Sequence, residues 1–182
     1  MKKQNLRVTI SKRMLKEGLI RCLKRKPLEK ITVSELCRDA QVNRTTFYNH
    51  YVIPKDILME IGMQHAAKVK EIFQTGKKKS MGERRKDVLC YIYSVRDELK
   101  TLFTAQADSH VEDTARDFFS WFTEGFIEER KGLLIKDEAE HEMILNCMGW
   151  SAYYLVRQWL TQYENKSPEE MHDFFERLSA GL

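Results

Sequence analysis

Glycine and proline are scarce in this sequence. Eight glycines and three prolines occur among 182 residues, of which 42% are hydrophobic. So few turn-forming residues argue against β-sandwiches, β-barrels and low-complexity disorder. The chain is long enough to bury a core, and we expect an all-α fold of about nine helices.

Long apolar runs are also absent. No stretch approaches the roughly 18 apolar residues that cross a bilayer, and residues 1–13 have no apolar signal-peptide core, which predicts a cytoplasmic protein. The four cysteines, at positions 22, 37, 90 and 147, do not show the C-x-x-C spacing of structural zinc sites. We expect reduced thiols, no metal and no cofactor.

Motifs typical of enzymes are missing as well. The five histidines are scattered, and His141 has no second histidine four residues later, as a zinc-protease helix requires. The sequence contains no glycine-rich phosphate loop, nucleophile elbow or dinucleotide fingerprint. A catalytic function is therefore not expected.

Charge is distributed unevenly along the chain. Residues 1–60 carry 14 Lys and Arg against 6 Asp and Glu, a net charge of +8, whereas residues 61–182 carry 17 against 21, a net charge of −4. This asymmetry suggests nucleic acid or an anionic membrane as the partner of the N-terminal third. A basic amphipathic helix is predicted over residues 10–23, but its apolar stripe has no bulky aromatic side chain, which disfavours the membrane.

Two short helices are predicted within residues 32–51. Residues 32–35 (Thr-Val-Ser-Glu) have the form of a capping box, which starts a helix that runs to about Ala40. Asn43 is a good N-cap for a second helix over residues 44–51. Helices of about eight residues are unstable alone, so these two must pack on each other and on the first helix. This is helix-turn-helix geometry, in which the second helix reads the DNA major groove.

The rest of the sequence predicts longer helices. Pro54 suits the first turn of a helix that runs to about Thr75, and a polar loop follows. Further helices are expected over residues 83–104, 109–131, 137–163 and 168–180, the last of them beginning at a Ser-Pro-Glu-Glu cap. We place a DNA-binding domain at residues 1–54 and a second helical domain at residues 55–182.

The helix-turn-helix segment resembles the TetR family of bacterial transcriptional regulators. The residues that carry the resemblance are Ile31-Thr32-Val33, Leu36, Ala40, Val42, Asn43-Arg44, Thr46-Phe47-Tyr48, His50-Tyr51, Asp56 and Leu58. Residues 149–171 look like the subgroup related to dihydroxyacetone kinase regulators. The resemblance implies a helix-turn-helix head, an all-α ligand and dimerisation body, and repression that a ligand relieves.

Two positions depart from the family pattern. Gln41 stands where the family usually has glycine, so it must adopt a left-handed backbone, at a cost of about 1 kcal/mol, or alter the turn. Pro54 replaces a lysine in the region that anchors a phosphate in the family. The anchor is then either the neighbouring Lys55 or a weaker contact.

The candidate DNA contacts lie mostly on the second short helix. Arg44 can bind guanine through two hydrogen bonds, and Asn49 can bind adenine in the same way. The whole set is Thr32, Arg44, Thr45, Thr46, Tyr48, Asn49, His50 and Lys55, with Tyr48 and His50 better suited to phosphates than to bases. An ordinary solvated helix surface is the alternative. We expect Lys12, Arg13 and residues 24–26 to form mainly a solvated basic face.

The aromatic residues of the C-terminal part can line a ligand cavity, or equally fill a core or a dimer interface. The pocket candidates are His65, Tyr93, Phe103, Trp121, Cys147, Trp150 and Tyr154. The last two predicted helices resemble the family's dimerisation pair, which forms a four-helix bundle with its copy. The interface candidates are Met143, Cys147, Tyr154, Met171, Phe174, Phe175 and Leu178.

The sequence therefore predicts a homodimeric regulator that binds a palindromic double-stranded DNA operator, as a repressor relieved by a small-molecule effector. The alternative is a DNA-bound regulator or activator whose C-terminal body is controlled by a co-regulator protein. Redox sensing through Cys37 or Cys147 is a third hypothesis.

Overall fold

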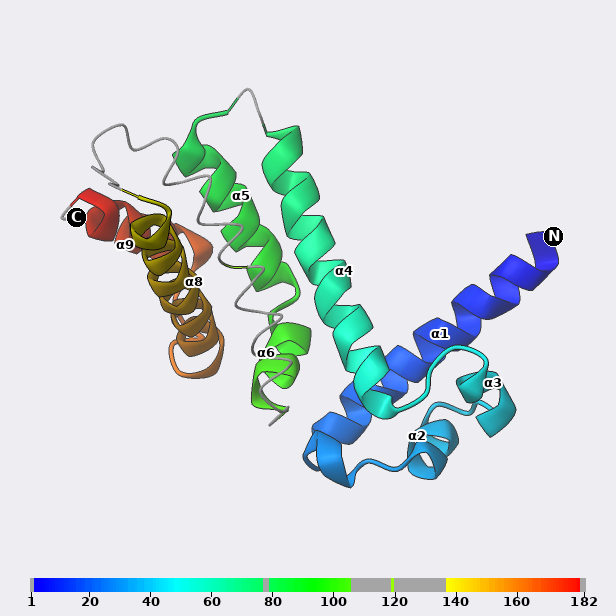
Figure 1. The fold of residues 1–182 in the computed structure, drawn as a ribbon. Coiled ribbons are helices and arrows are strands. Elements are labelled where there is room, and N and C mark those ends of the chain that lie inside the picture. Colours follow the sequence, from blue (N-terminus) through cyan, green and yellow to red (C-terminus); the bar gives the residue numbers. More distant parts are fainter. Residues whose placement is uncertain (1, 77–78, 106–118, 120–136, 181–182) are drawn as a thin grey trace. The chain divides into compact units, whose positions relative to one another are not determined.

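The computed structural model describes residues 2–76, 79–105, 119 and 137–180. All regular structure in these ranges is helical, as predicted, and comprises eight α-helices and one 3-10 turn (Figure 1). The helix expected over residues 109–131 lies outside the described residues. The chain forms two compact units, one made of the residues up to His65 and a short segment that begins at Thr101, the other of Ala66–Lys100 and the C-terminal residues.

The first unit contains the predicted helix-turn-helix. Its elements are α1 (Lys2–Leu23), the 3-10 turn η1 (Leu28–Lys30), α2 (Val33–Asp39), α3 (Arg44–Tyr48) and the start of α4 (Pro54–Thr75). Helix α2 packs against both α1 and α3 (Figure 1). Leu15, Leu19, Leu36, Phe47 and Ile57 are fully buried between these helices, so the short helices share one apolar core.

Helices α1 and α2 approach each other closely at Gly18. A Cβ atom added at this glycine would lie 2.8 Å from the Ala40 Cβ and 3.1 Å from the Ala40 Cα. Ala40 is itself a small residue, and Gly18 is the partner that makes the close approach possible.

The caps of the two short helices form largely as predicted. The Thr32 hydroxyl accepts the Glu35 N–H at 3.3 Å, and the Asn43 side chain accepts the Thr45 N–H at 2.9 Å. The second half of the predicted capping box does not form, because the Glu35 carboxylate pairs with Lys26 instead. Helix α3 ends at Tyr48, three residues earlier than expected, since the His50 N–H turns back to the Phe47 carbonyl at 2.9 Å.

The turn between the helices realises the first of the two alternatives expected at Gln41, a left-handed backbone. Gln41 has a φ of 54° and is the only non-glycine residue with positive φ in the described ranges. The Val42 N–H then donates to the Cys37 carbonyl at 2.9 Å. The turn therefore has the left-handed backbone that glycine would adopt without strain, and Gln41 adopts it at an energetic cost.

The second unit contains α5 (Met81–Ser94), most of α6 (Arg96–Thr104), α8 (Glu138–Thr161) and α9 (Pro168–Ala180). The prediction of one helix over residues 83–104 was wrong. The chain breaks at Val95, where the Ser94 hydroxyl bonds to the Tyr91 carbonyl at 2.7 Å and competes with the helix backbone. Asp97 and Glu98 then favour a new helix start.

The start of α5 was predicted two residues too late. The Ser80 hydroxyl accepts the Glu83 N–H at 3.3 Å, and the Glu83 carboxylate accepts the Ser80 N–H at 2.8 Å, which makes a complete capping box. The Ser-x-x-Glu spacing is present in the sequence and could have located this start. At α9 the equivalent box between Ser167 and Glu170 forms as predicted.

Gln41→Gly should stabilise the protein. Glycine adopts the left-handed backbone without the Cβ clash, so we expect the free energy of unfolding to rise by about 0.5 to 1 kcal/mol. Urea denaturation monitored by circular dichroism measures the change. The matched control is Gln64→Gly, at an exposed position inside α4, which should lower stability by about 1 kcal/mol. Destabilisation by both variants would contradict the assignment of strain to position 41.

Candidate nucleic-acid interface

Helix α3 presents a polar face to solvent. Arg44, Thr45, Tyr48 and Asn49 are exposed, and Tyr48 retains 60% of its accessible surface. The Tyr48 ring stands edge-on to Phe47 with centroids 5.2 Å apart, so the buried phenylalanine fixes the orientation of the exposed tyrosine. Thr46 and His50 are half-buried. Phe47 and Tyr51 lie in the core at 0% and 5% exposure, as predicted.

The remaining candidate contacts lie at helix starts. Thr32 is exposed at the N-cap of α2, and Lys55 is half-buried in the first turn of α4. Asp56 fixes this turn, because its carboxylate accepts the N–H groups of Val52 at 2.7 Å and Ile53 at 3.0 Å. The loop between α3 and α4 is thereby held at its C-terminal end.

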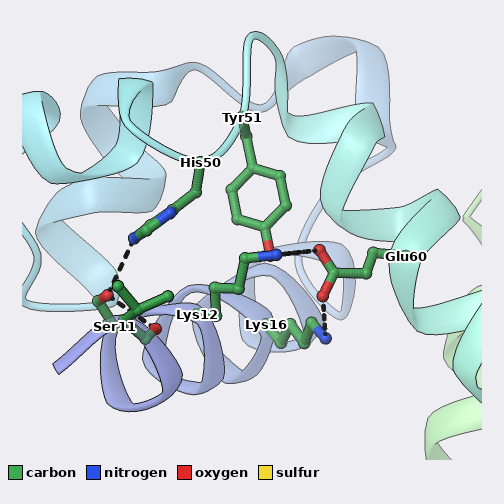
Figure 2. A network of polar contacts seen from close by, with 7 residues as sticks. Ser11, Lys12, Lys16, His50, Tyr51 and Glu60 are labelled. Atoms are coloured by element: carbon green, nitrogen blue, oxygen red, sulfur yellow. Dashed lines mark hydrogen bonds and ion pairs between the residues drawn. The ribbon is translucent and has the colours of Figure 1, made fainter. Parts of the chain in front are cut away.

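A cluster around Glu60 attaches Tyr51, which follows α3, to α1 and α4. The Glu60 carboxylate accepts hydrogen bonds from Lys12 at 2.9 Å, Lys16 at 2.8 Å and the Tyr51 hydroxyl at 2.8 Å. Figure 2 shows the three donors converging on the one acidic side chain, from α1 and from the segment that follows α3. Because Tyr51 is three residues from the end of α3, Glu60 fixes that end relative to α1 and α4.

The electrostatics of the cluster favour an ionised carboxylate. Partial burial acts to raise the pKa of Glu60, but the hydrogen bonds from Lys16, Lys12 and Tyr51 outweigh it and lower the pKa to about 2. Burial, together with the hydrogen bond to Glu60, raises the pKa of the Tyr51 phenol above its ordinary value. Tyr51 is therefore a neutral donor to a charged acceptor, which is a strong type of hydrogen bond.

A second contact supports the same attachment. The His50 Nε2 lies 3.3 Å from the Ser11 hydroxyl, and the Lys12 ammonium lies 5.2 Å from the centre of the Tyr51 ring (Figure 2). His50, a predicted phosphate contact, thus also has a partner inside the unit. Its contact with α1 was not predicted.

Sequence reasoning missed Glu60 and expected Lys12, which lies one helical turn from Lys16 on α1, to be solvated. Both lysines alternate with Leu15 and Leu19 at helical spacing, and the side chains of Lys12 and Lys16 are 33% and 16% exposed. That spacing indicates cations at the edge of a core, where they need an acidic partner.

Many cations of the basic N-terminal third are neutralised within it. Arg21 and Arg25 bind Asp39 at 2.7 and 2.6 Å, and Lys26 pairs with Glu35. Lys12, Arg25 and Lys26 are therefore paired with acidic side chains, which the sequence did not indicate, although Arg25 is exposed to solvent as expected. The charge available to an anionic partner is smaller than the sequence total implies.

The predicted pocket residues do not surround the cavity found in the described part of the second unit. A shallow depression of about 360 Å³ there is lined by Ile72, Thr75, Gly76, Lys79, Asp87 and Cys90, none of which was predicted. Tyr93 instead stacks on the buried Trp159, with centroids 5.9 Å apart, and Trp150 stacks on Tyr154 at 5.7 Å. Cys147 is exposed, His65 and Phe103 are half-buried, and Trp121 lies outside the described residues.

The predicted interface residues include an exposed row on α8. Met143, Cys147 and Tyr154 follow a spacing of four and seven residues and are exposed, Met143 at 63% and Tyr154 at 47%. On α9, Leu178 is 42% exposed, and Phe174 and Phe175 are half-buried. Met171 is buried at 8% exposure, because it packs inside its own unit.

Metal-binding clusters and membrane-spanning helices are both absent from the described part of the chain. No group of three or more His, Cys, Asp or Glu side chains in these ranges is placed to hold a metal ion. None of the helices described is both long and apolar enough to cross a membrane.

A helix-turn-helix with a polar outer face, joined to a helical body, is the architecture of a DNA-binding transcriptional regulator. Residues 83–181 match the family model TetR_C_8, described as "Transcriptional regulator C-terminal region". The chain belongs to the TetR family of transcriptional regulators, which confirms the resemblance seen in the sequence. No curated protein matches the sequence significantly.

Solved structures share this fold at low sequence identity. A TetR transcriptional regulator from Streptococcus agalactiae is 19% identical, with a TM-score of 0.70 over 96% of both chains. The dihydroxyacetone kinase operon activator DhaS is 16% identical, with a TM-score of 0.63 over 93% of this chain and 94% of that one. Thermus thermophilus FadR, a TetR family repressor in complex with lauroyl-CoA, is 16% identical, with a TM-score of 0.58 over 92% of both chains.

Glu60→Gln should destabilise the protein at neutral pH. The variant leaves two lysines without a counter-charge, so we expect a loss of about 2 kcal/mol in the free energy of unfolding at pH 7. Because the pKa of Glu60 falls from 4.5 to about 2 on folding, its contribution is complete above pH 4.5 and disappears as the pH approaches 2. The difference between wild type and variant should therefore shrink over this range in urea denaturation.

Glu71→Gln is the matched control. Glu71 pairs with Lys68 on the surface of α4, where its side chain is 59% exposed. We expect a change below about 0.5 kcal/mol with little dependence on pH. Equal losses in the free energy of unfolding at pH 7 would show that the Glu60 cluster contributes no more to stability than an exposed ion pair.

Proposed function

We propose that the protein is a sequence-specific DNA-binding regulator that acts as a homodimer on a palindromic operator, as a repressor that a small-molecule ligand releases. The observation that carries the proposal is the polar outer face of α3. Its side chains Arg44, Thr45, Tyr48 and Asn49 are exposed, while Phe47 and Tyr51 anchor the helix in the core. Such a helix can enter the major groove without losing its own packing.

The roles of the side chains follow from their chemistry. Arg44 at the start of α3 binds guanine through two hydrogen bonds, and Asn49 binds adenine. Thr45 and Thr46 contact a thymine methyl group or a phosphate. Thr32, Tyr48, His50 and Lys55 bind phosphates and set the register of the helix on the duplex.

Dimerisation uses α8 and α9. The exposed apolar side chains Met143, Tyr154 and Leu178 are suited to a partner surface, together with Cys147 and the half-buried Phe174 and Phe175. In a symmetric dimer the two α3 helices enter successive major grooves, roughly 34 Å apart.

Ligand control acts through α4. A ligand in the C-terminal body that shifts this helix would move Glu60, and with it the end of the recognition segment. Typical coupling between two such sites is about 1 to 3 kcal/mol. The similar structure of FadR in complex with lauroyl-CoA supports control by a small molecule. A metabolite that raises the unfolding temperature and weakens DNA binding would identify the effector.

A second candidate is an activator controlled by a partner protein. It is supported by the similarity of the fold to DhaS, an operon activator. In that case DNA binding persists, no metabolite weakens it, and the C-terminal body binds a protein.

The operator itself can be obtained by selection from a random duplex library with the full-length protein. An enriched palindrome supports the proposal, and failure to enrich any sequence contradicts it. On the selected duplex, Arg44→Ala should weaken binding tenfold to a hundredfold, or about 1 to 3 kcal/mol, because alanine cannot form the two hydrogen bonds to guanine. A gel-shift titration measures the change.

Arg96→Ala is the control for this substitution. It removes the same charge from an exposed position on α6 and should leave the affinity for the operator unchanged. Equal losses of affinity in both variants would mean that Arg44 acts only through the net charge of the protein.

Phe174→Glu and Leu178→Glu should each shift the dimer towards monomer, because a charge is placed in the apolar interface. Leu178 is the more exposed of the two, so its substitution disturbs the fold of the subunit less. Sedimentation velocity measures the shift. Arg177→Glu, on the polar face of α9, is the control and should remain dimeric. A dimer that persists in both test variants would place the interface elsewhere.

A further inference from the structure

The acidic side chains of α2 are directed towards basic partners on the segment that precedes it. Glu35 pairs with Lys26. Asp39 accepts hydrogen bonds from the Arg21 Nε at 2.7 Å and from Arg25 at 2.6 Å, and Arg21 also donates to the Asp39 carbonyl at 2.9 Å. Both carboxylates of α2 are therefore occupied by cations from outside the helix.

Arg38 lies between these two acids in the sequence of α2. Its side chain is exposed, whereas Leu36 and Cys37 are buried on the other side of the helix. Among the residues that the structure describes, no carboxylate forms an ion pair with its guanidinium, and the charge of Arg38 acts on the Glu35 carboxylate only over a longer distance. The pairing of Glu35 and Asp39 with other cations explains why.

The position of Arg38 is next to the turn of the helix-turn-helix. The Gln41 N–H donates to the Arg38 carbonyl at 3.3 Å, and Asn43 caps α3 two residues later. The charge of Arg44 acts on the Cys37 thiol, where it opposes the rise in pKa that burial causes. The start of α3 is therefore near the C-terminal half of α2, and Arg38 and Arg44 flank the same turn.

We propose that Arg38 binds a phosphate of the DNA backbone beside the groove that α3 enters. The inference rests on the proposed DNA-binding function and adds to it a contact from α2. The planar guanidinium donates two parallel hydrogen bonds to phosphate oxygens. Such a contact positions the recognition helix without reading a base, whereas Arg44 reads the sequence.

A purely structural role is the competing explanation. Arg38 lies in the last turn of α2, where a cation interacts favourably with the helix dipole. That role would change the stability of the protein when Arg38 is replaced, but it would not change the number of counterions released on DNA binding.

The salt dependence of binding separates the two roles and does not require the operator. Fluorescence anisotropy with a fluorescein-labelled duplex of arbitrary sequence gives the affinity of the full-length protein from about 50 to 250 mM salt. We expect Arg38→Gln to make the slope of log K against log[salt] shallower by about 0.9 for each phosphate that the variant no longer neutralises. Arg38→Lys keeps the charge and should keep the wild-type slope.

Arg25→Gln is the matched control. Its side chain is 51% exposed but is paired with Asp39, so the slope should stay at the wild-type value. Circular dichroism checks that each variant is folded at the temperature of the titration.

The outcomes separate this inference from the proposed function. If wild type shows no binding, or binding without salt dependence, the DNA-binding function fails and the inference with it. If wild type binds with a steep slope and Arg38→Gln has the same slope, the function stands and the phosphate contact is wrong, whether or not the unfolding temperature falls. A slope reduced equally in Arg25→Gln and Arg38→Gln would also overturn the specific assignment to Arg38.

Discussion

The carboxylate of Glu60 is the constraint on which the geometry of the N-terminal unit depends. It is the acceptor for two lysines of α1 and for the buried phenol of Tyr51. Each of these donors would be costly to remove from water without a partner. Helix α3 has five residues, too few to be stable in isolation. Its orientation is therefore set by Phe47 in the core and by this cluster at its C-terminal end.

Features that depend on neighbouring residues could be predicted from the sequence. The caps at Thr32, Asn43 and Ser167 are local hydrogen bonds between a side chain and a backbone group at most three residues away, so the residue types alone indicate them. The left-handed backbone of Gln41 was one of two alternatives that the family resemblance implied, because the family usually has glycine at this position. These signals were sufficient to locate the helix-turn-helix and its exposed face.

Features that depend on packing between distant segments could not be predicted. Glu60 is 44 to 48 residues from its lysine partners, and no periodicity within one helix reveals such a pairing. The same reason explains why Met171 is buried although it was expected in an interface. The break at Val95 is different, because apolar spacing continues through it and only the competing Ser94 hydroxyl marks the end of the helix.

The close approach of α1 to α2 also limits which residues can replace Gly18. In most helix interiors glycine is a poor choice, and alanine would improve stability. At Gly18 the nearest atoms belong to the Cβ and the backbone of Ala40, which cannot rotate away as the end of a long side chain can. Any larger residue must separate the two helices and so tilt the recognition segment. A substitution at position 18 would then change the orientation of α3 without replacing any residue of its polar face.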